Sequence, residues 1–187
     1  MPSHLPPHIR AKLEPIRLVV LDVDGVLTDG SLFYSAGGEE MKAFNVHDGL
    51  GIRLMLDCGI EVGIITGRSS AAVSARCSDL GLNEALVFLG SKDKGADLDQ
   101  MLSTLGIADH EMAAMGDDLP DLPMLIRAGF SFCPTDAVPE VIATCDHICG
   151  RIGGDGAVRE AAEILLKAKG RWTGLVEELS SPVRGQR

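Results

Sequence analysis

The fold is decided by residues 16–25, which read IRLVVLDVDG. This apolar run is rich in β-branched side chains, a composition that predicts a strand buried on both faces of a parallel sheet. Asp22 and Asp24 end the run, and Gly25 lets the backbone turn sharply behind them. A carboxylate at the end of a buried strand loses its hydration unless a cation compensates it. A hard divalent ion is therefore expected here, although an Asp-Gly pair can also mark a simple turn.

Beyond this strand, further apolar runs alternate with amphipathic helical segments. The expected strands are residues 61–65, 85–88, 112–115, 130–133 and 147–149, and the expected helices are 8–14, 50–58, 69–80, 94–105, 119–128 and 157–169. This alternation predicts right-handed βαβ units and a doubly wound parallel sheet, a Rossmann-like α/β fold with helices on both faces. A β-hairpin is expected after the first strand, with arms at 32–35 and 39–44 around Gly37 and Gly38.

The length and charge of the chain limit its organisation and partners. The chain has 187 residues and a formal net charge of −10. We expect one domain over 16–170, with an N-terminal extension at 1–15 and a tail at 171–187. The negative charge argues against non-specific nucleic-acid binding. Because no apolar run is long enough for a membrane helix and the N-terminus lacks a signal-peptide pattern, we expect a cytoplasmic protein without a membrane partner.

Five cysteines are scattered through the chain without a CxxC pair, which favours free thiols in a reducing compartment. Cys145, His147 and Cys149 stand close together along an expected strand. Because strand residues alternate between two faces, we do not expect these three side chains to share one zinc ion.

A second acidic cluster follows the strand at 112–115 and reads GDDLPD at residues 116–121. A helix N-terminus explains one of its carboxylates, because anionic side chains complement the helix dipole, but it explains three less well. Ligands of such sheets sit at the carboxyl ends of the strands, so Asp117 is expected to share a site with Asp22. Two acidic clusters at one site predict an oxygen-rich Mg²⁺ centre.

Two further residues are expected at the same edge of the sheet. Thr66 begins the Thr-Gly-Arg turn after the strand at 61–65, where its hydroxyl and the neighbouring N–H groups can hold a phosphate. Capping of the next helix is an equally good explanation of this threonine. Lys94 begins the helix at 94–105, and although a single lysine is usually a surface charge, its place at this edge favours a role in the site.

Four motifs occur in the order Asp-x-Asp-Gly-x-x-Thr, Thr-Gly-Arg, Lys and Gly-Asp-Asp-x-x-Asp, and in this the chain resembles the haloacid dehalogenase superfamily of phosphatases. The resemblance implies that Asp22 is the nucleophile and forms an aspartyl phosphate. It implies that Asp24 is the general acid and base, and that its backbone carbonyl ligates Mg²⁺. Thr66 and Lys94 would hold the phosphoryl oxygens. Asp117 would complete the metal ligands.

Finer features resemble a small, cap-less, tetrameric branch of this superfamily, the 3-deoxy-D-manno-octulosonate (Kdo) 8-phosphate phosphatases of lipopolysaccharide biosynthesis. These features are the hairpin, residues 42–53 and residues 151–160. Too few residues separate the first motif from Asn45 for a separate cap domain, so neighbouring subunits of a homotetramer would close the site over a sugar-acid phosphate. The resemblance implies supporting roles for Asp118 and Asp121, and substrate contacts from Asn45, Val46, His47, Asp48, Gly49, Arg53, Arg68, Arg76 and Lys94.

Two positions depart from the pattern of this branch and leave the substrate open. His47 stands where arginine is common, and Asp155 replaces a commonly basic residue. The alternative is a sister phosphatase for a nine-carbon, sialic-type acid 9-phosphate, but Arg68 favours the eight-carbon acid because the sister branch tends to carry Glu there. A non-catalytic receiver module is a remote alternative, since the strand at 61–65 ends in Thr66 rather than Asp.

The glycine-rich run at residues 153–156 admits two interpretations. It is an ordinary loop into the helix at 157–169, or a mobile segment that helps to close an active site across a subunit boundary. The resemblance to the cap-less branch favours the second.

Overall fold

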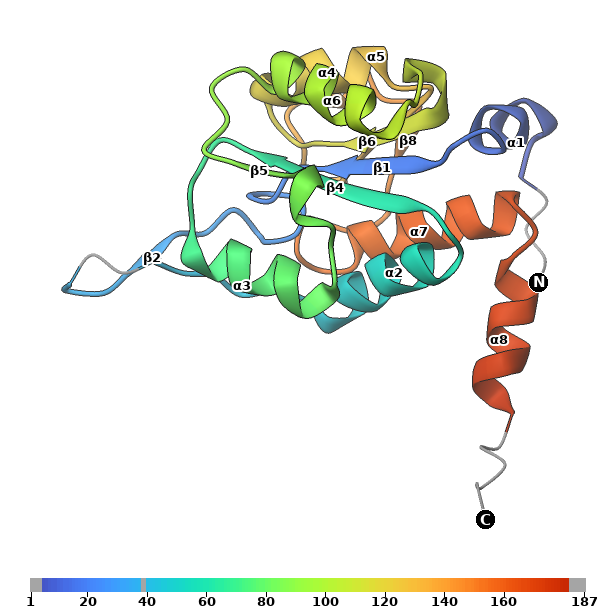
Figure 1. Ribbon diagram of the computed structural model, residues 1–187, viewed down its shortest axis with the longest axis horizontal. Helices are drawn as coiled ribbons and strands as arrows, with labels where there is room; N and C mark the ends of the chain where they lie inside the picture. Colours follow the sequence, from blue (N-terminus) through green and yellow to red (C-terminus); the bar gives the residue numbers. More distant parts are fainter. Residues whose placement is uncertain (1–4, 38–39, 182–187) are drawn as a thin grey trace.

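The computed structural model describes residues 5–37 and 40–181. Its centre is a six-stranded parallel sheet in the order β5-β4-β1-β6-β7-β8 (Figure 1). The chain winds outward from β1 in both directions, which confirms the predicted doubly wound α/β fold. The strands are β1 (Leu18–Leu21), β4 (Glu61–Thr66), β5 (Val87–Leu89), β6 (Met112–Met115), β7 (Phe130–Cys133) and β8 (His147–Ile148).

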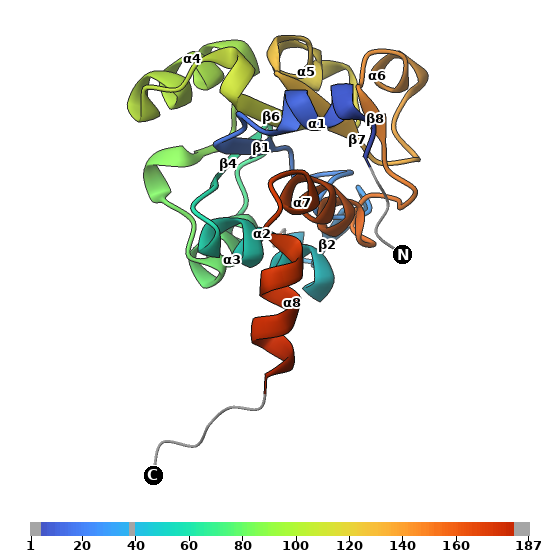
Figure 2. The same cartoon turned by 90° about the vertical axis from the view of Figure 1, so that its right-hand side faces the viewer.

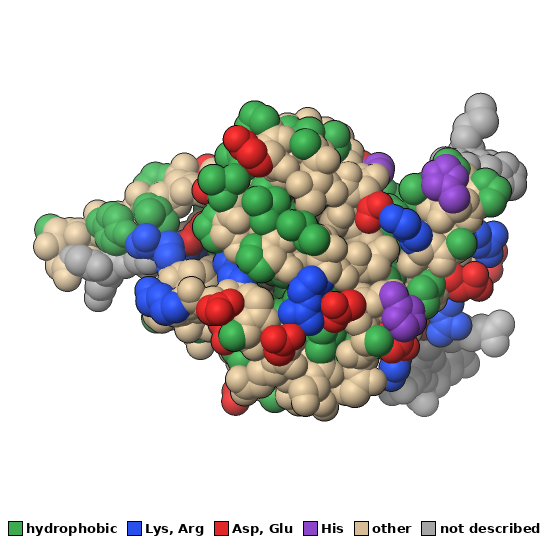
Figure 3. All heavy atoms as spheres, turned by 90° about the horizontal axis from the view of Figure 1, so that it is seen from above, with side chains coloured by type: hydrophobic (Ala, Val, Ile, Leu, Met, Phe, Trp, Pro, Cys, Tyr) green, Lys and Arg blue, Asp and Glu red, His purple; other side chains and the backbone are tan. Residues whose placement is uncertain are grey.

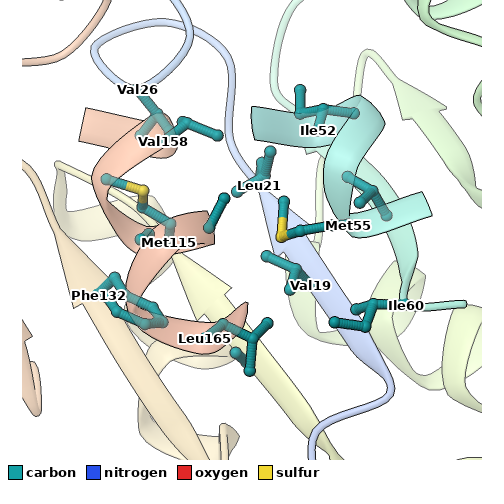
Figure 4. Packing of buried hydrophobic residues seen from close by; sticks show 14 of the residues in the cluster. Val19, Leu21, Val26, Ile52, Met55, Ile60, Met115, Phe132, Val158 and Leu165 are labelled. Carbon is teal, nitrogen blue, oxygen red and sulfur yellow. The ribbon is translucent and has the colours of Figure 1, made fainter. Parts of the chain in front are cut away.

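Helices cover both faces of the sheet because the side chains of β1 alternate between two cores. Val19 and Leu21 enter one core, and Leu18 and Val20 enter the other. Figure 4 shows the first core, where Val19 and Leu21 lie between side chains of α2 and α7. The helices of this face are α2 (Val46–Asp57), α3 (Ala71–Leu80) and α7 (Ala157–Ala168), and those of the opposite face are α4 (Lys94–Leu105), α5 (Leu122–Arg127) and α6 (Pro139–Ile142).

Most predicted helices are present with shifted ends, and the shifts have local causes. Helix α2 begins four residues earlier than expected, because the Asn45 side chain accepts a hydrogen bond from the His47 N–H at 2.8 Å and caps the helix. The predicted helix at 119–128 is divided into a 3₁₀ turn, η3 (Leu119–Asp121), and α5. Pro120 and Pro123, which lack N–H groups, stand in the first turns of these two elements. The other 3₁₀ turns are η1 (Glu84–Leu86) and η2 (Asp109–Glu111).

The hairpin inserted after β1 is confirmed, and it takes the place of a separate cap domain. Its antiparallel strands β2 (Phe33–Tyr34) and β3 (Glu40–Met41) are shorter than predicted, and Gly38 of the expected turn lies outside the described residues. The hairpin projects from the body, with hydrophobic side chains gathered along it (Figure 3). Phe33, Tyr34 and Met41 are each more than half exposed, at 52%, 57% and 61%.

The two ends of the described chain pack differently. Helix α1 (Pro7–Leu13) contacts α7, and its Leu13 is buried in the core. Helix α8 (Trp172–Ser180) projects away from the body (Figure 2), with Val176 and Leu179 exposed. Trp172 fixes its first turn, since the ring lies 5.3 Å from the Arg159 guanidinium and 5.1 Å from Lys167 Nζ. Across the part of the chain that the structure describes, every helix is too short or too polar to cross a bilayer.

Candidate active site

Four of the predicted site residues meet at the carboxyl ends of the central strands. Asp22 follows β1, Asp117 follows β6, Thr66 ends β4, and Lys94 begins α4. Strands β1 and β6 are hydrogen-bonded neighbours in parallel register, so the loops that follow them leave the sheet side by side. The four residues border a cavity of about 220 Å³. Its lining residues are Asp22, Asp24, Thr66, Gly67, Arg68, Lys94, Asp117, Asp118, Pro120 and Asp121.

Lys94 is a buried cation held between two buried carboxylates. Its Nζ lies 2.8 Å from Asp22 Oδ1 and forms a second ion pair with Asp121. Burial by itself lowers the pKa of a lysine, but the charges of Asp22 and Asp121 outweigh this effect and raise it. Lys94 therefore stays charged, and the surface reading of this lysine is excluded because it is 8% exposed.

The single positive charge of Lys94 does not balance the negative charges of all the carboxylates around it. Burial, reinforced by the charge of Asp121, raises the pKa of Asp22 to about 6. Burial, reinforced by Asp121 and Asp22, raises the pKa of Asp117 to about 7. Asp117 Oδ1 is also buried and accepts no hydrogen bond from the described residues. Because oxygens of Asp22, Asp117 and Asp121 lie within 4.8 Å of one another, this cluster fits a hard divalent cation such as Mg²⁺.

Gly25 is required by the backbone of the first motif. It has φ of +87°, and a Cβ at this position would lie 2.0 Å from Asp117 Oδ2. Gly153 lies against the other side of the same turn, where a Cβ would meet the Gly25 carbonyl oxygen at 1.8 Å. The Gly153 N–H donates to Asp136 at 3.0 Å, and the Gly154 N–H donates to the Val26 carbonyl at 2.9 Å. The glycine-rich run is thus packed against the turn at Gly25.

Asp24 has two cationic neighbours, and the sequence analysis missed one of them. The Lys42 side chain, which is fully buried, forms an ion pair with Asp24, and Arg68 Nε lies 3.9 Å from the same carboxylate. Arg68 also donates a hydrogen bond to the Tyr34 hydroxyl on β2. Lys42 follows β3, so the hairpin brings both Lys42 and Tyr34 to the site. The sequence indicates that the Asp24 carboxylate needs a cationic partner. The spacing of residues along the chain does not indicate that Lys42 is this partner.

Asp118 and Asp121 shape the second acidic loop. Asp121 Oδ2 accepts hydrogen bonds from the N–H groups of Asp117 and Asp118, at 3.0 and 3.3 Å. Asp118 Oδ1 accepts from the Leu119 N–H at 2.7 Å. The loop is therefore fixed by its own carboxylates, and Asp121 links it to Lys94. This arrangement is consistent with the supporting roles predicted for both residues.

Residues 45–49, which belong to the predicted substrate contacts, lie at the start of α2. Asp48 is 1% exposed, and its oxygens accept hydrogen bonds from the Gly156 and Arg159 N–H groups at 3.1 and 2.8 Å. It therefore caps α7 and has a structural role at this position. Asn45 reaches the same segment, because its side-chain amide lies 3.4 Å from Asp155 Oδ1.

The remaining predicted contacts are divided between two surroundings. His47 and Asp155, the two departures from the branch pattern, line one polar cavity of about 540 Å³ together with Arg151 and Arg159. Val46 is exposed beside it. Arg53 and Arg76 instead link α2 to α3: Arg53 donates to the Asp79 carbonyl, and Arg76 donates to the Asn45 carbonyl at 3.4 Å. Arg76 also pairs with the Asp79 carboxylate of its own helix at 3.1 Å. Gly49 leaves the space that Arg76 occupies, since a Cβ there would lie 2.2 Å from its guanidinium.

Comparisons with known proteins agree with this site. Residues 87–160 match the family of haloacid dehalogenase-like hydrolases. The 3-deoxy-D-manno-octulosonate 8-phosphate phosphatase KdsC of Salmonella typhimurium is 45% identical over 165 residues, which cover 88% of this chain and 87% of that protein. The chain belongs to the haloacid dehalogenase superfamily.

Two solved structures of haloacid dehalogenase phosphatases are similar over nearly the whole chain. The phosphatase of the same name from Moraxella catarrhalis, in complex with a magnesium ion, a phosphate ion and Kdo, has a TM-score of 0.89 at 39% identity, covering 92% of this chain and 98% of that one. The cobalt-bound phosphatase from Haemophilus influenzae has a TM-score of 0.82 at 42% identity, covering 85% and 92%. The predicted superfamily and its cap-less fold are therefore confirmed.

Proposed function

We propose that this chain is a Mg²⁺-dependent phosphatase whose substrate is 3-deoxy-D-manno-octulosonate 8-phosphate. The observation that carries the proposal is the buried Lys94 between Asp22 and Asp121. Beside it lies Asp117, whose buried Oδ1 accepts no hydrogen bond from the described residues. A site with several carboxylates and one lysine suits a phosphoryl group bound together with a divalent cation. The identity of the substrate rests on the named relatives at 41–45% identity.

In this proposal Asp22 is the nucleophile. One of its carboxylate oxygens attacks phosphorus, the bond from phosphorus to the sugar oxygen breaks, and an aspartyl phosphate forms. Lys94 and the Thr66 hydroxyl hold the phosphoryl oxygens, and Lys94 offsets the charge that would repel an anionic nucleophile. Mg²⁺, held by Asp22, Asp117 and the backbone carbonyl of Asp24, would supply further positive charge at the phosphoryl group.

Asp24 is the general acid and base. Its proton passes to the sugar oxygen as this group leaves, and the resulting carboxylate then accepts a proton from the water that attacks the aspartyl phosphate. Phosphate is released and Asp22 is regenerated. Lys42 pairs with the Asp24 carboxylate and so holds it in one orientation, while Arg68 is placed to reach the acidic substrate from the same side.

The decisive experiment is a comparison of kcat/KM across a panel of sugar phosphates with Mg²⁺ present. Kdo 8-phosphate should exceed N-acetylneuraminate 9-phosphate and simple hexose phosphates by at least tenfold. A preference for the nine-carbon acid would replace the proposed substrate with that of the sister branch. Absence of turnover on every phosphate ester would overturn the proposal as a whole.

The covalent step has its own test. Protein quenched during turnover and reduced with borohydride should carry the modification on the tryptic peptide that contains Asp22, as read by mass spectrometry. Unmodified Asp22 in samples that still release phosphate would indicate direct attack by water.

The metal requirement is tested by chelation. Exhaustive treatment with a chelator should reduce activity to the background rate, Mg²⁺ should restore it, and Ca²⁺ should inhibit. Ca²⁺ prefers more ligands and a looser geometry, which would misplace Asp22 for in-line attack. Full activity in the chelated protein would exclude the proposed role of the cation.

We also propose that the hairpin assembles a homotetramer. A two-stranded ribbon is marginally stable in water, yet this one presents Phe33, Tyr34 and Met41 with at least half of each side chain exposed. Pairing with hairpins of neighbouring copies would bury them. Light scattering should give a mass near four times 19.8 kDa, and a monomer with full activity would contradict the assembly.

The projecting helix α8 is the part of the chain proposed to act across the subunit boundary. Truncation after Lys169 removes Trp172, Leu175 and Val176, and it should change KM or product release more than Mg²⁺ binding. Steady-state kinetics at saturating and limiting Mg²⁺ separate these effects. Unchanged kinetics in a truncated tetramer would show that the tail has no part in the reaction.

A further inference from the structure

A second cluster of metal-binding residue types lies away from the catalytic carboxylates. It is made of His147, Cys149 and Glu160, and one potential ligand atom from each lies within 4.8 Å of the others. Nε2 of His147 is 3.7 Å from Glu160 Oε1. This nitrogen is buried and forms no hydrogen bond with the described part of the chain. The role of these three side chains is not explained by the phosphatase site.

The fold produces this cluster from two elements. His147 and Cys149 are two residues apart at the end of β8, so their side chains project to the same side, while Ile148 between them is 45% exposed. The Cys149 N–H donates to the Cys133 carbonyl of β7 at 2.8 Å, which fixes this position. Glu160 comes from the first turn of α7. Our expectation that strand alternation separates His147 from Cys149 was therefore wrong.

The separation of His147 and Glu160 suits two ligands of one tetrahedral metal ion. Zn²⁺ binds nitrogen, oxygen and sulfur at roughly 2.0–2.3 Å, so neighbouring nitrogen and oxygen ligands stand about 3.4 Å apart in a tetrahedron. The 3.7 Å between His147 and Glu160 requires a closure of only a few tenths of an ångström. Three protein ligands would leave one position for water.

The surroundings hold two of the three ligands in place. Both oxygens of Glu160 accept the Gly150 N–H, at 3.1 and 3.0 Å, and this orients the carboxylate. The His147 ring packs edge-on against Phe132, with ring centroids 5.9 Å apart. Cys149 is 1% exposed, and its thiol donates to the Ala157 carbonyl at 3.6 Å, a contact that a metal–thiolate bond would replace.

We propose that His147, Cys149 and Glu160 form a second metal site, which binds a transition-metal ion of the Zn²⁺ type. The nitrogen, sulfur and oxygen donors differ from the all-carboxylate cluster at Asp22, and they favour Zn²⁺ over Mg²⁺. Binding would release the thiol proton of Cys149, because the thiolate is the form of cysteine that ligates a metal.

Such an ion would connect β8 to α7 on either side of the glycine-rich run. That run includes Gly153, which packs against the catalytic turn at Gly25. Binding would therefore stabilise the protein and fix the support of the active site without adding a catalytic group. At a metal concentration of about one hundred times Kd, the expected rise in Tm is about 5–10 °C.

The test is a Co²⁺ titration of the full-length protein, with Mg²⁺ in excess to occupy the catalytic carboxylates. The expected result is one equivalent of Co²⁺ with a thiolate-to-cobalt charge-transfer band in the near ultraviolet and the intense visible bands of four-coordinate Co²⁺. Zn²⁺ should abolish both. A spectrum without the charge-transfer band, or Co²⁺ that Mg²⁺ displaces, would overturn the proposal.

Variants tie the spectrum to the three residues. Cys149→Ser should remove the charge-transfer band, and His147→Gln should weaken Co²⁺ binding by about 10–100-fold. His147 is partly exposed, so its substitution keeps the test decisive if the buried Cys149→Ser protein fails to fold. The matched control is Cys145→Ser, a neighbouring cysteine outside the cluster, which should bind as the parent protein does. Equal Co²⁺ affinity in His147→Gln and the control would refute the site.

Discussion

The two metal sites proposed for this protein lie at parallel strands of one sheet, but they are built from different donors. The catalytic cluster follows β1 and β6 and combines Asp22, Asp117 and Asp121 with Lys94. The second lies at the edge strand β8 and combines His147 and Cys149 with Glu160. One offers carboxylate oxygens alone, and the other combines one carboxylate with a nitrogen and a sulfur donor.

The position of a strand in the sheet determines where a site lies, while the donor atoms determine which ion the site binds. At the centre of the sheet, burial and the charges of neighbouring carboxylates raise the pKa values of Asp22 and Asp117, and the cluster suits both Lys94 and a divalent cation. At the edge, backbone N–H groups and ring packing suffice to orient the ligands. Removal of a charge from the cluster at Asp22 should therefore strongly affect activity and stability. The same change should leave metal binding at His147, Cys149 and Glu160 unaltered.

The largest expected effect separates the clusters by activity. Asp22→Asn keeps the side-chain shape but cannot form an acyl phosphate, so kcat/KM should fall by roughly 10⁴-fold or more while circular dichroism stays unchanged. Asp29→Asn, an exposed carboxylate in the same loop, should retain activity. Co²⁺ binding at the second cluster should be the same in both variants. Near-normal turnover in pure Asp22→Asn protein would contradict the catalytic assignment.

Lys94→Met tests the charge dependence of the catalytic cluster. Removal of a cation that is 8% exposed leaves Asp22 and Asp121 buried without their partner, which should lower the free energy of unfolding by about 3–5 kcal/mol. Urea unfolding in the presence of a chelator measures this loss. Lys92→Met, two residues earlier and exposed, should change stability by less than about 0.5 kcal/mol. Equal stability of the two variants would mean that the buried ion pairs contribute nothing.

Lys42→Gln probes the hairpin's contribution to the same site. Loss of the ion pair releases the Asp24 carboxylate, so kcat should fall by about 10–100-fold with little change in KM. Steady-state kinetics distinguish this from a binding defect. Lys12→Gln is the matched control. Lys12 forms an exposed ion pair with Asp146, and neither residue lines the active-site cavity. A change in KM alone would assign Lys42 to substrate binding instead.

The smallest effect concerns pH and Mg²⁺. In the metal-free protein the pKa of Asp22 rises from 3.8 to about 6, and that of Asp117 from 3.8 to about 7. The unfolded chain ionises these groups more easily, so metal-free stability should fall as pH rises from about 4 to 7. Mg²⁺ should thus raise Tm more at pH 8 than at pH 5.5, as differential scanning fluorimetry can show. A pH-independent Mg²⁺ effect would contradict the cause given for these shifts.

The parts of the fold that follow from the sequence are those with a local signal. The buried strand at 16–25 predicted β1, the alternation that follows predicted the parallel sheet, and helix α4 begins and ends where the sequence placed it. It also placed Asp22 and Asp117 together, because parallel strands end at one edge of a sheet and the motifs after them must converge.

By itself, then, the sequence determined the sheet and which of its edges brings Asp22, Thr66, Lys94 and Asp117 together, since periodicity and turn chemistry act over a few neighbouring residues. Only the tertiary structure decided which distant side chains reach them. Lys42 meets Asp24 through the hairpin, Asp48 caps α7 across more than one hundred residues, and Glu160 joins His147 through the packing of a helix against an edge strand. Such contacts depend on how whole elements pack, and no local pattern encodes them.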